Sequence, residues 1–180
     1  MIVKKYNKFL FLTIILLCAL VTMYLKYIQN HYNGDNVENI KNTICIMKEN
    51  IKKEDIKIID TTIIEEYRII AFRENNTLGI ITFQKQKQHY QFHTIQYHHH
   101  NKEIALFSFY YFDEYDKGHD YDILFNCNKY LAYFYRSKNN EKPQKFIIEK
   151  CPSVIFINNE ECKDSDHIKY KFYDSMDKEL

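Results

Sequence analysis

The sequence predicts an α+β protein in which an N-terminal transmembrane helix and one amphipathic helix precede a mostly antiparallel, curled β-sheet or sandwich. Three observations support this fold class. An uncharged apolar run fills Phe9–Leu25, apolar residues then recur at helical spacing up to Ile51, and after Glu54 the apolar period changes to two. A helix followed by a series of strands is typical of α+β domains.

The N-terminal run (FLFLTIILLCALVTMYL) has the composition of a membrane anchor. As a helix it would extend about 26 Å, and tilting or lysine snorkelling covers the rest of a bilayer core. Lys4, Lys5 and Lys8 precede the run, and such lysines stay in the cytoplasm. We therefore expect a single-pass cell-membrane protein with a cytoplasmic basic tail at 1–8, an anchor in the lipid bilayer at 9–28, a linker at 29–35 and an extracytoplasmic α+β domain at 36–180.

A cleaved signal peptide and a lipoprotein are the alternatives to an uncleaved anchor. A signal peptide needs small residues at its cleavage site, but the stretch after Cys18 reads Ala-Leu-Val-Thr-Met-Tyr-Leu. A bacterial lipoprotein needs a small residue before its acylated cysteine, whereas Leu17 precedes Cys18. The uncleaved anchor is the favoured interpretation.

The first element expected outside the membrane is an amphipathic helix. Its apolar residues follow one another at three- and four-residue steps, which places them on one face: Val37, Ile40, Ile44, Met47 and Ile51. Asp35 or Asn36 can serve as its N-cap. The lysines near its end suit the negative end of the helix dipole.

Ten β-strands are expected after this helix, because each segment is rich in β-branched or aromatic residues. They are Ile56–Asp60, Ile63–Arg73, Thr77–Gln84, His89–Tyr97, Glu103–Phe112, Tyr121–Asn126, Lys129–Arg136, Lys145–Glu149, Val154–Ile157 and Ile168–Tyr173. Turn residues such as Asn75-Asn76 and Gly118 separate them. The short connections favour antiparallel hairpins.

Composition excludes several classes of function. The chain has 25 Lys and Arg against 24 Asp and Glu, so nothing indicates a nucleic-acid partner. Four of the basic residues lie in the first 28 positions, where no acidic residue occurs, which leaves 21 basic against 24 acidic residues and a net charge of −3 in the remainder. Three isolated glycines exclude a phosphate-binding loop, and no G-x-S-x-G motif marks a nucleophile. No cofactor is expected.

Four cysteines fall in the outer domain, where an oxidising environment would allow two disulfides. Cys151 and Cys162 flank an expected hairpin and would close the smaller loop. Cys45 and Cys127 would then tie the helix to the sheet. The alternative is four unpaired thiols, and the absence of C-x-x-C argues against a thiol-redox or zinc-ribbon site.

A histidine cluster is the candidate metal site. Side chains alternate along a strand, so His98 and His100 share one face and could share a metal ion. A third ligand would come from elsewhere, such as His119 or an acid. The alternative is a polar turn ahead of Asn101-Lys102, and no H-E-x-x-H motif supports a metal.

The segment from Phe107 to Asp122 combines aromatic and acidic residues. Its carboxylates could recruit Ca²⁺, but they do not follow the EF-hand pattern and are expected to form a solvated loop. The aromatic residues could line a pocket or contact a partner. Alternating aromatics in strands more often fill the core, which is the favoured interpretation here.

The overall layout resembles the uncharacterised single-span membrane-anchored extracytoplasmic proteins of low-GC Gram-positive bacteria. The matching features are the Lys4-Lys5 start, the Phe9–Leu25 span and the Ile63–Gln84 strand pair. The resemblance concerns architecture alone, so it implies no activity and transfers no functional residues.

These features predict a membrane-tethered extracytoplasmic module that is non-enzymatic and binds an unknown envelope protein or ligand. One alternative is a metal-dependent envelope enzyme that uses the cluster at His98 and His100. Another is a toxin-immunity or stress factor that acts in the membrane.

Overall fold

The computed structural model describes residues 2–98, 103–139, 141–159 and 167–180, and it confirms the α+β class. Two α-helices and one short 3-10 helix come first: α1 (Ile2–His31), α2 (Val37–Met47) and η1 (Lys53–Asp55). The strands follow: β1 (Ile56–Ile64), β2 (Tyr67–Glu74), β3 (Thr77–Gln86), β4 (His89–His98), β5 (Ile104–Phe112), β6 (Gly118–Asn126), β7 (Tyr133–Lys138), β8 (Gln144–Ile147), β9 (Ser153–Asn158) and β10 (Ile168–Tyr173).

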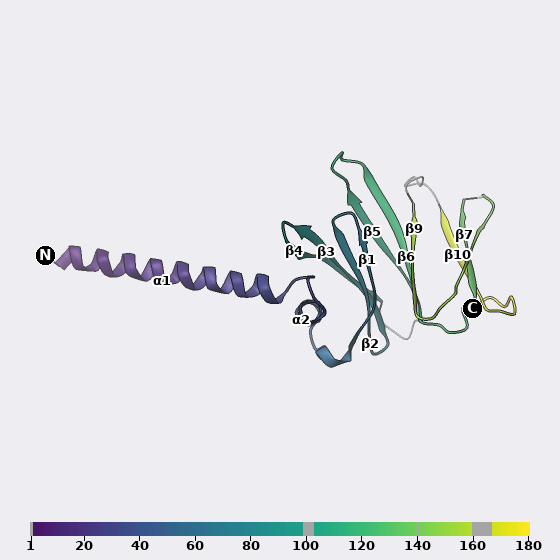
Figure 1. Cartoon of the computed structure of the whole chain (residues 1–180), viewed down its shortest axis with the longest axis horizontal. Helices are drawn as coiled ribbons and strands as arrows, with labels where there is room; N and C mark the ends of the chain where they lie inside the picture. Colours follow the sequence, from purple (N-terminus) through teal and green to yellow (C-terminus); the bar gives the residue numbers. More distant parts are fainter. Residues whose placement is uncertain (1, 99–102, 140, 160–166) are drawn as a thin grey trace.

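The described strands form three antiparallel sheets (Figure 1). Sheet A has the order β1-β2-β3-β4, sheet B the order β5-β6-β9, and sheet C the order β10-β7-β8. Neighbours in sheet A are joined by hairpins, whereas β9 reaches β6 only after the chain has built β7 and β8. The antiparallel arrangement is confirmed, and the expected curl of the sheet stays a prediction.

Sheet A buries both of its faces, because alternate residues of its central strands point in opposite directions. On β2, Ile70 and Phe72 belong to an apolar cluster that includes Ile40 and Ile44 of α2. The intervening residues of β2 belong to a second cluster, which joins sheet A to sheet B. This explains why β2 reads as an almost continuous apolar run rather than as a half-polar strand.

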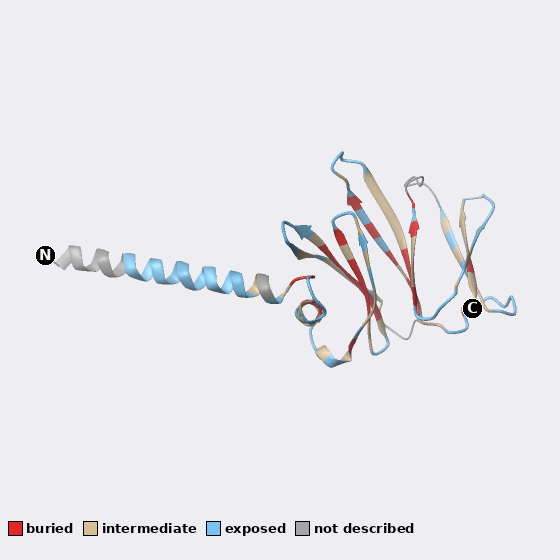
Figure 2. Cartoon of the chain, viewed as in Figure 1, coloured by how far each residue is buried: buried red, intermediate tan, exposed pale blue. Residues whose placement is uncertain are grey.

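Sheet B is covered on both sides in the same way. Phe125 of β6 packs toward sheet A, whereas its neighbour Leu124 forms a third cluster with Phe134 of sheet C. The order of layers is therefore α2, sheet A, sheet B and sheet C. Figure 2 shows the buried residues concentrated in the strands between these layers.

The amphipathic helix forms as expected and covers the outer face of sheet A. The Asn36 side chain caps it by accepting a hydrogen bond from the backbone N–H of Asn39 at 2.9 Å. Of the predicted apolar face, Ile40 and Ile44 are buried, whereas Val37 and Met47 are exposed. The helix ends at Met47, one turn before the last residue of the sequence pattern.

The boundary between β1 and β2 differs from the sequence interpretation. One strand was expected over Ile63–Arg73, but the structure places a tight turn at Glu65-Glu66 within it. Glu65 adopts a left-handed backbone with φ of 50°. This turn contains no glycine, proline or asparagine, so it lacks the usual sequence signal. The turn at Asn75, with φ of 49°, does carry that signal and lies where expected.

Helix α1 contains one segment, Phe11–Ile28, that is long and apolar enough to cross a membrane. None of that segment is buried in the structure. The helix extends away from the β domain, as Figure 1 shows. A membrane anchor and a signal sequence both have these properties.

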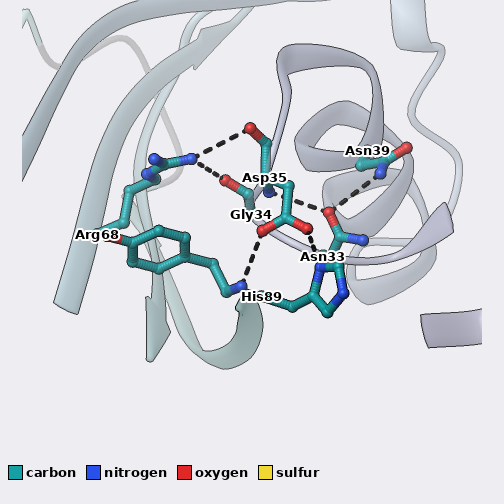
Figure 3. A network of polar contacts seen from close by, with 7 residues as sticks. Asn33, Gly34, Asp35, Asn39, Arg68 and His89 are labelled. Carbon is teal, nitrogen blue, oxygen red and sulfur yellow. Dashed lines mark hydrogen bonds and ion pairs between the residues drawn. The ribbon is translucent and has the colours of Figure 1, made fainter. Parts of the chain in front are cut away.

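The segment expected to be a linker is held against sheet A by hydrogen bonds (Figure 3). The Gly34 N–H donates to the carbonyl of Tyr90 at 2.7 Å, and the Tyr90 N–H donates to Asp35 Oδ1 at 2.8 Å. Asp35 Oδ2 lies 2.6 Å from His89 Nδ1. Arg68 donates to the carbonyls of Gly34 and Asp35. The chain that follows α1 is therefore fastened to two strands.

Close packing reinforces this junction. The Arg68 guanidinium lies 4.0 Å from the centre of the Tyr90 ring, a favourable cation–π arrangement. A Cβ atom at position 34 would lie 2.5 Å from Cγ of the buried Phe83, so only glycine fits there. Asn33 is buried and accepts hydrogen bonds from Asp35 N–H and the Asn39 side chain, both at 3.0 Å.

We predict that Arg68→Ala loosens this junction without disturbing the remote sheets. The loss of two hydrogen bonds and a ring contact should lower the free energy of unfolding by about 1–3 kcal/mol. Amide exchange measured by NMR on the detergent-solubilised chain should be faster at Gly34 and Tyr90. Arg73→Ala, at the other end of β2, is the control and should leave the exchange at these two positions unchanged. Equal exchange in both variants would contradict the assignment.

Candidate functional site

Of the two histidines expected to hold a metal ion, His98 is the one that the structure describes, and it contacts β5. His98 Nε2 donates to the carbonyl of Leu106 at 2.8 Å, and its ring centre lies 5.0 Å from that of Phe107. His98 therefore joins β4 to β5. His100 lies outside the described residues. Within the described part of the chain, no group of three His, Cys, Asp or Glu side chains is placed to hold a metal ion.

The cysteine pairs expected from the sequence are not formed among the described residues. Cys45 and Cys127 are both free. They pack beside different apolar clusters, Cys45 on the α2 side of sheet A and Cys127 on the sheet B side, so sheet A separates them. Cys151 is also free, and Cys162, its expected partner, lies outside the described residues.

An acidic pocket with aromatic walls is the most distinctive concave site. It encloses about 530 Å³ between the β1–β2 turn and the end of the β5–β6 hairpin. The described residues that line it comprise four acids and three aromatics and include no Lys, Arg or His: Glu65, Glu66, Tyr111, Phe112, Asp113, Glu114 and Tyr115. We call this site the acidic pocket.

Asp113 gives the acidic pocket a fixed negative charge. Its Oδ1 accepts the backbone N–H groups of Tyr115 and Lys117, both at 2.9 Å, and its Oδ2 lies 2.9 Å from His119 Nε2. These hydrogen bonds, first of all the one from His119, hold the pKa of Asp113 below its ordinary value. The carboxylate is therefore ionised at neutral pH and is held in place by the hairpin.

The aromatic residues divide between the core and the pocket rim. Tyr111 is buried, and its ring centre lies 5.3 Å from that of Tyr67 and 5.6 Å from that of Phe109. Phe112 and Tyr115 are exposed, Tyr115 to 81%. The expectation that this run fills the core thus holds for alternate residues only, because side chains alternate along β5 and those at Ser108, Tyr110 and Phe112 are exposed.

The pocket suits a positively charged group that carries apolar surface. Carboxylates attract an ammonium or guanidinium group, and an exposed aromatic face adds a cation–π contact. The sequence predicts that the carboxylates after Phe112 form a solvated loop, with Ca²⁺ binding as the alternative. No sequence pattern connects Glu65 and Glu66 with them, because only the fold brings the β1–β2 turn beside the hairpin.

A second polar cluster lies between sheets B and C. Tyr170 of β10 donates to the Asp122 carboxylate, while Arg136 of β7 donates to Asn159 Oδ1 at 2.5 Å. Burial and the charge of Asp122 raise the pKa of Asp120, and burial with the Asp122 contact raises that of Tyr170 well above its usual range. These groups bond to one another across the interface, so their role is to align the two sheets.

Comparison with known proteins finds no family model, no curated protein and no solved structure that matches the chain.

We predict that His119→Asn raises the pKa of Asp113 toward its ordinary value, because the largest stabilising contact of the carboxylate is weakened. An NMR titration of the carboxyl carbon would measure this. Since the pKa is depressed in the folded state, the contribution of Asp113 to stability is present above the unfolded value and is lost as pH falls through the folded value. An unchanged titration midpoint in the variant would contradict the assigned contact.

Proposed function

We propose that this chain is a membrane-tethered extracytoplasmic binding module whose acidic pocket binds a Lys- or Arg-bearing segment of an envelope protein. The observation that carries the proposal is the pocket lining, with four carboxylates and three aromatic rings among its described residues. Exposed aromatics beside charged groups are typical of interaction sites. The proposal is non-enzymatic, because the described pocket residues offer neither a paired nucleophile and base nor a metal site.

The tether is α1, with its N-terminus in the cytoplasm and the β domain outside. Lysines occupy positions 4, 5 and 8, ahead of the apolar segment Phe11–Ile28, as the positive-inside rule requires for this orientation. The hydrogen-bonded junction at Gly34 and Asp35 supports an anchor that stays attached to the domain. If the chain were cleaved just after α1, this hydrogen-bonded segment would lie at the new N-terminus and would no longer connect a helix to the domain.

A protein segment is favoured over a small amine as the occupant. The pocket opens on an exposed hairpin end where Phe112 and Tyr115 present more apolar surface than a small amine can cover. Residues 29–180 carry a net charge of −3, which would also steer a basic partner toward the domain.

We predict that epitope tags at the two ends of the chain report opposite sides of the membrane. An antibody applied to intact cells should reach the C-terminal tag, and the N-terminal tag should become accessible only after permeabilisation. Both tags should remain on one chain. Loss of the N-terminal tag from the mature protein would indicate a cleaved signal sequence and overturn the tether.

We predict that Glu65→Lys with Glu114→Lys weakens binding of a basic probe about tenfold, since two favourable charge contacts become repulsive. The probe is a ten-residue peptide of alternating Lys and Ser, titrated calorimetrically against the full chain in detergent. Glu141→Lys with Glu149→Lys is the matched control, because it changes the net charge equally at exposed sites outside the pocket lining.

The two double variants separate pocket binding from general charge attraction. An equal loss of affinity for the peptide in both double variants would contradict binding in the acidic pocket. Tight binding of lysine methyl ester alone would point to a small amine and overturn the choice of a protein segment. In native membranes, crosslinks from the β5–β6 hairpin to a single co-purified protein would support the proposal, and an absence of such crosslinks would oppose it.

A further inference from the structure

Two cysteines that the sequence assigns to different partners lie together in the structure. Cys127 follows β6 and Cys151 precedes β9, and both line a second pocket of about 500 Å³ at the end of the domain away from the acidic pocket. Cys151 is exposed and Cys127 is half-buried.

The strand register brings the two backbones within reach of a covalent bond. Asn126 of β6 pairs with Ser153 of β9 as the last pair of that ladder. Cys127 directly follows Asn126, and Cys151 comes two residues before Ser153. Paired strands lie about 4.8 Å apart and rise about 3.4 Å per residue, so an offset of one residue separates Cα atoms by about 6 Å, within the range of about 4.4–6.8 Å that disulfides need. Cys151 lies before the first residue of β9, and both cysteines line the same pocket.

The surroundings hold the Cys127 backbone in place and raise the pKa of both thiols. The Cys127 N–H donates to the carbonyl of Glu103 at 2.6 Å, which fixes this residue to the start of β5. The positive side chain of Arg73 lies close enough to lower the pKa of both thiols. Burial outweighs this effect, so the pKa of each thiol is above its ordinary value. Because thiols with a raised pKa react slowly, these two cysteines are better suited to forming one stable disulfide than to repeated oxidation and reduction.

We infer that Cys127 and Cys151 are the sites of an oxidative cross-link, forming a disulfide between the end of β6 and the approach to β9. The oxidant is a disulfide, either of low molecular weight or in a thiol oxidoreductase. The Cys151 thiolate attacks one sulfur of the oxidant, forming a mixed disulfide and releasing one thiol. The Cys127 thiolate then attacks the Cys151 sulfur and releases the second thiol. Two cysteine thiols are oxidised, one disulfide is reduced, and the two protons leave on the released thiols.

The cross-link would strengthen the attachment of sheet C. The chain between the two cysteines contains β7 and β8, so the bond closes a loop that carries this hairpin. Closing a loop of this length limits the freedom of the unfolded chain. We expect the melting temperature of the oxidised protein to rise by about 10 °C.

The test treats reduced full-length protein in detergent with oxidised glutathione and identifies the linked peptides by mass spectrometry without reduction. Trypsin leaves Cys151 and Cys162 on one peptide, so a protease that cuts after glutamate must be added to separate them. The expected product links Cys127 to Cys151, with the rise in melting temperature removed by dithiothreitol. Cys162→Ser should still form it.

Two further variants test whether the cross-link requires Cys151. Cys151→Ser, at an exposed position, should abolish both the linked peptide and the thermal shift. Cys45→Ser is the control at a partly buried cysteine and should retain both. A dominant Cys151–Cys162 product, or two unreacted thiols at equilibrium, would overturn the inference. Because this test uses purified protein, its result is independent of the proposed pocket ligand and of membrane orientation.

Discussion

Apolar contact between sheets A and B is the interaction on which the other layers depend. Residues such as Ile69 and Ile80 of sheet A meet Phe107 and Phe125 of sheet B in one buried cluster. Because strand side chains alternate, filling this interface leaves an equally apolar row on the far face of each sheet. Sheet A covers its far face with α2, and sheet B covers its far face with sheet C. The layer order follows because both faces of the two central sheets are apolar and each face must be covered.

Both candidate pockets lie at the ends of this same interface. At one end, the buried rings of Tyr67 and Tyr111 bring the β1–β2 turn to the β5–β6 hairpin and so assemble the acidic pocket. At the other end, β2 ends next to Arg73 and β6 ends next to Cys127, and the pocket lined by Cys127 and Cys151 lies there. A displacement of the two sheets would therefore alter both sites. Turns and strand ends form the rims of both pockets, and a rigid scaffold holds exposed functional side chains at such positions.

Polar contacts decide how the outer layers are oriented. Hydrogen bonds among Asp122, Arg136, Asn159 and Tyr170 fix sheet C relative to sheet B. At the opposite side of the molecule, Arg68 and Asp35 fix the end of α1 to sheet A. Apolar packing is not directional, whereas hydrogen bonds specify an alignment. The domain thus combines an apolar interior with directional contacts at its first and last layers.

The sequence by itself determined the elements whose signals are local. The apolar run of α1, the 3.6-residue period of α2 and most strands follow from periodicity and turn chemistry in short windows. Only the tertiary structure decided what depends on distant neighbours. It divided the strands into three sheets, separated Cys45 from Cys127, placed Cys127 beside Cys151, and moved Glu65 next to Asp113. The physical reason is that a residue pattern specifies which face is apolar, but the partner of that face is chosen by the packing of the whole chain.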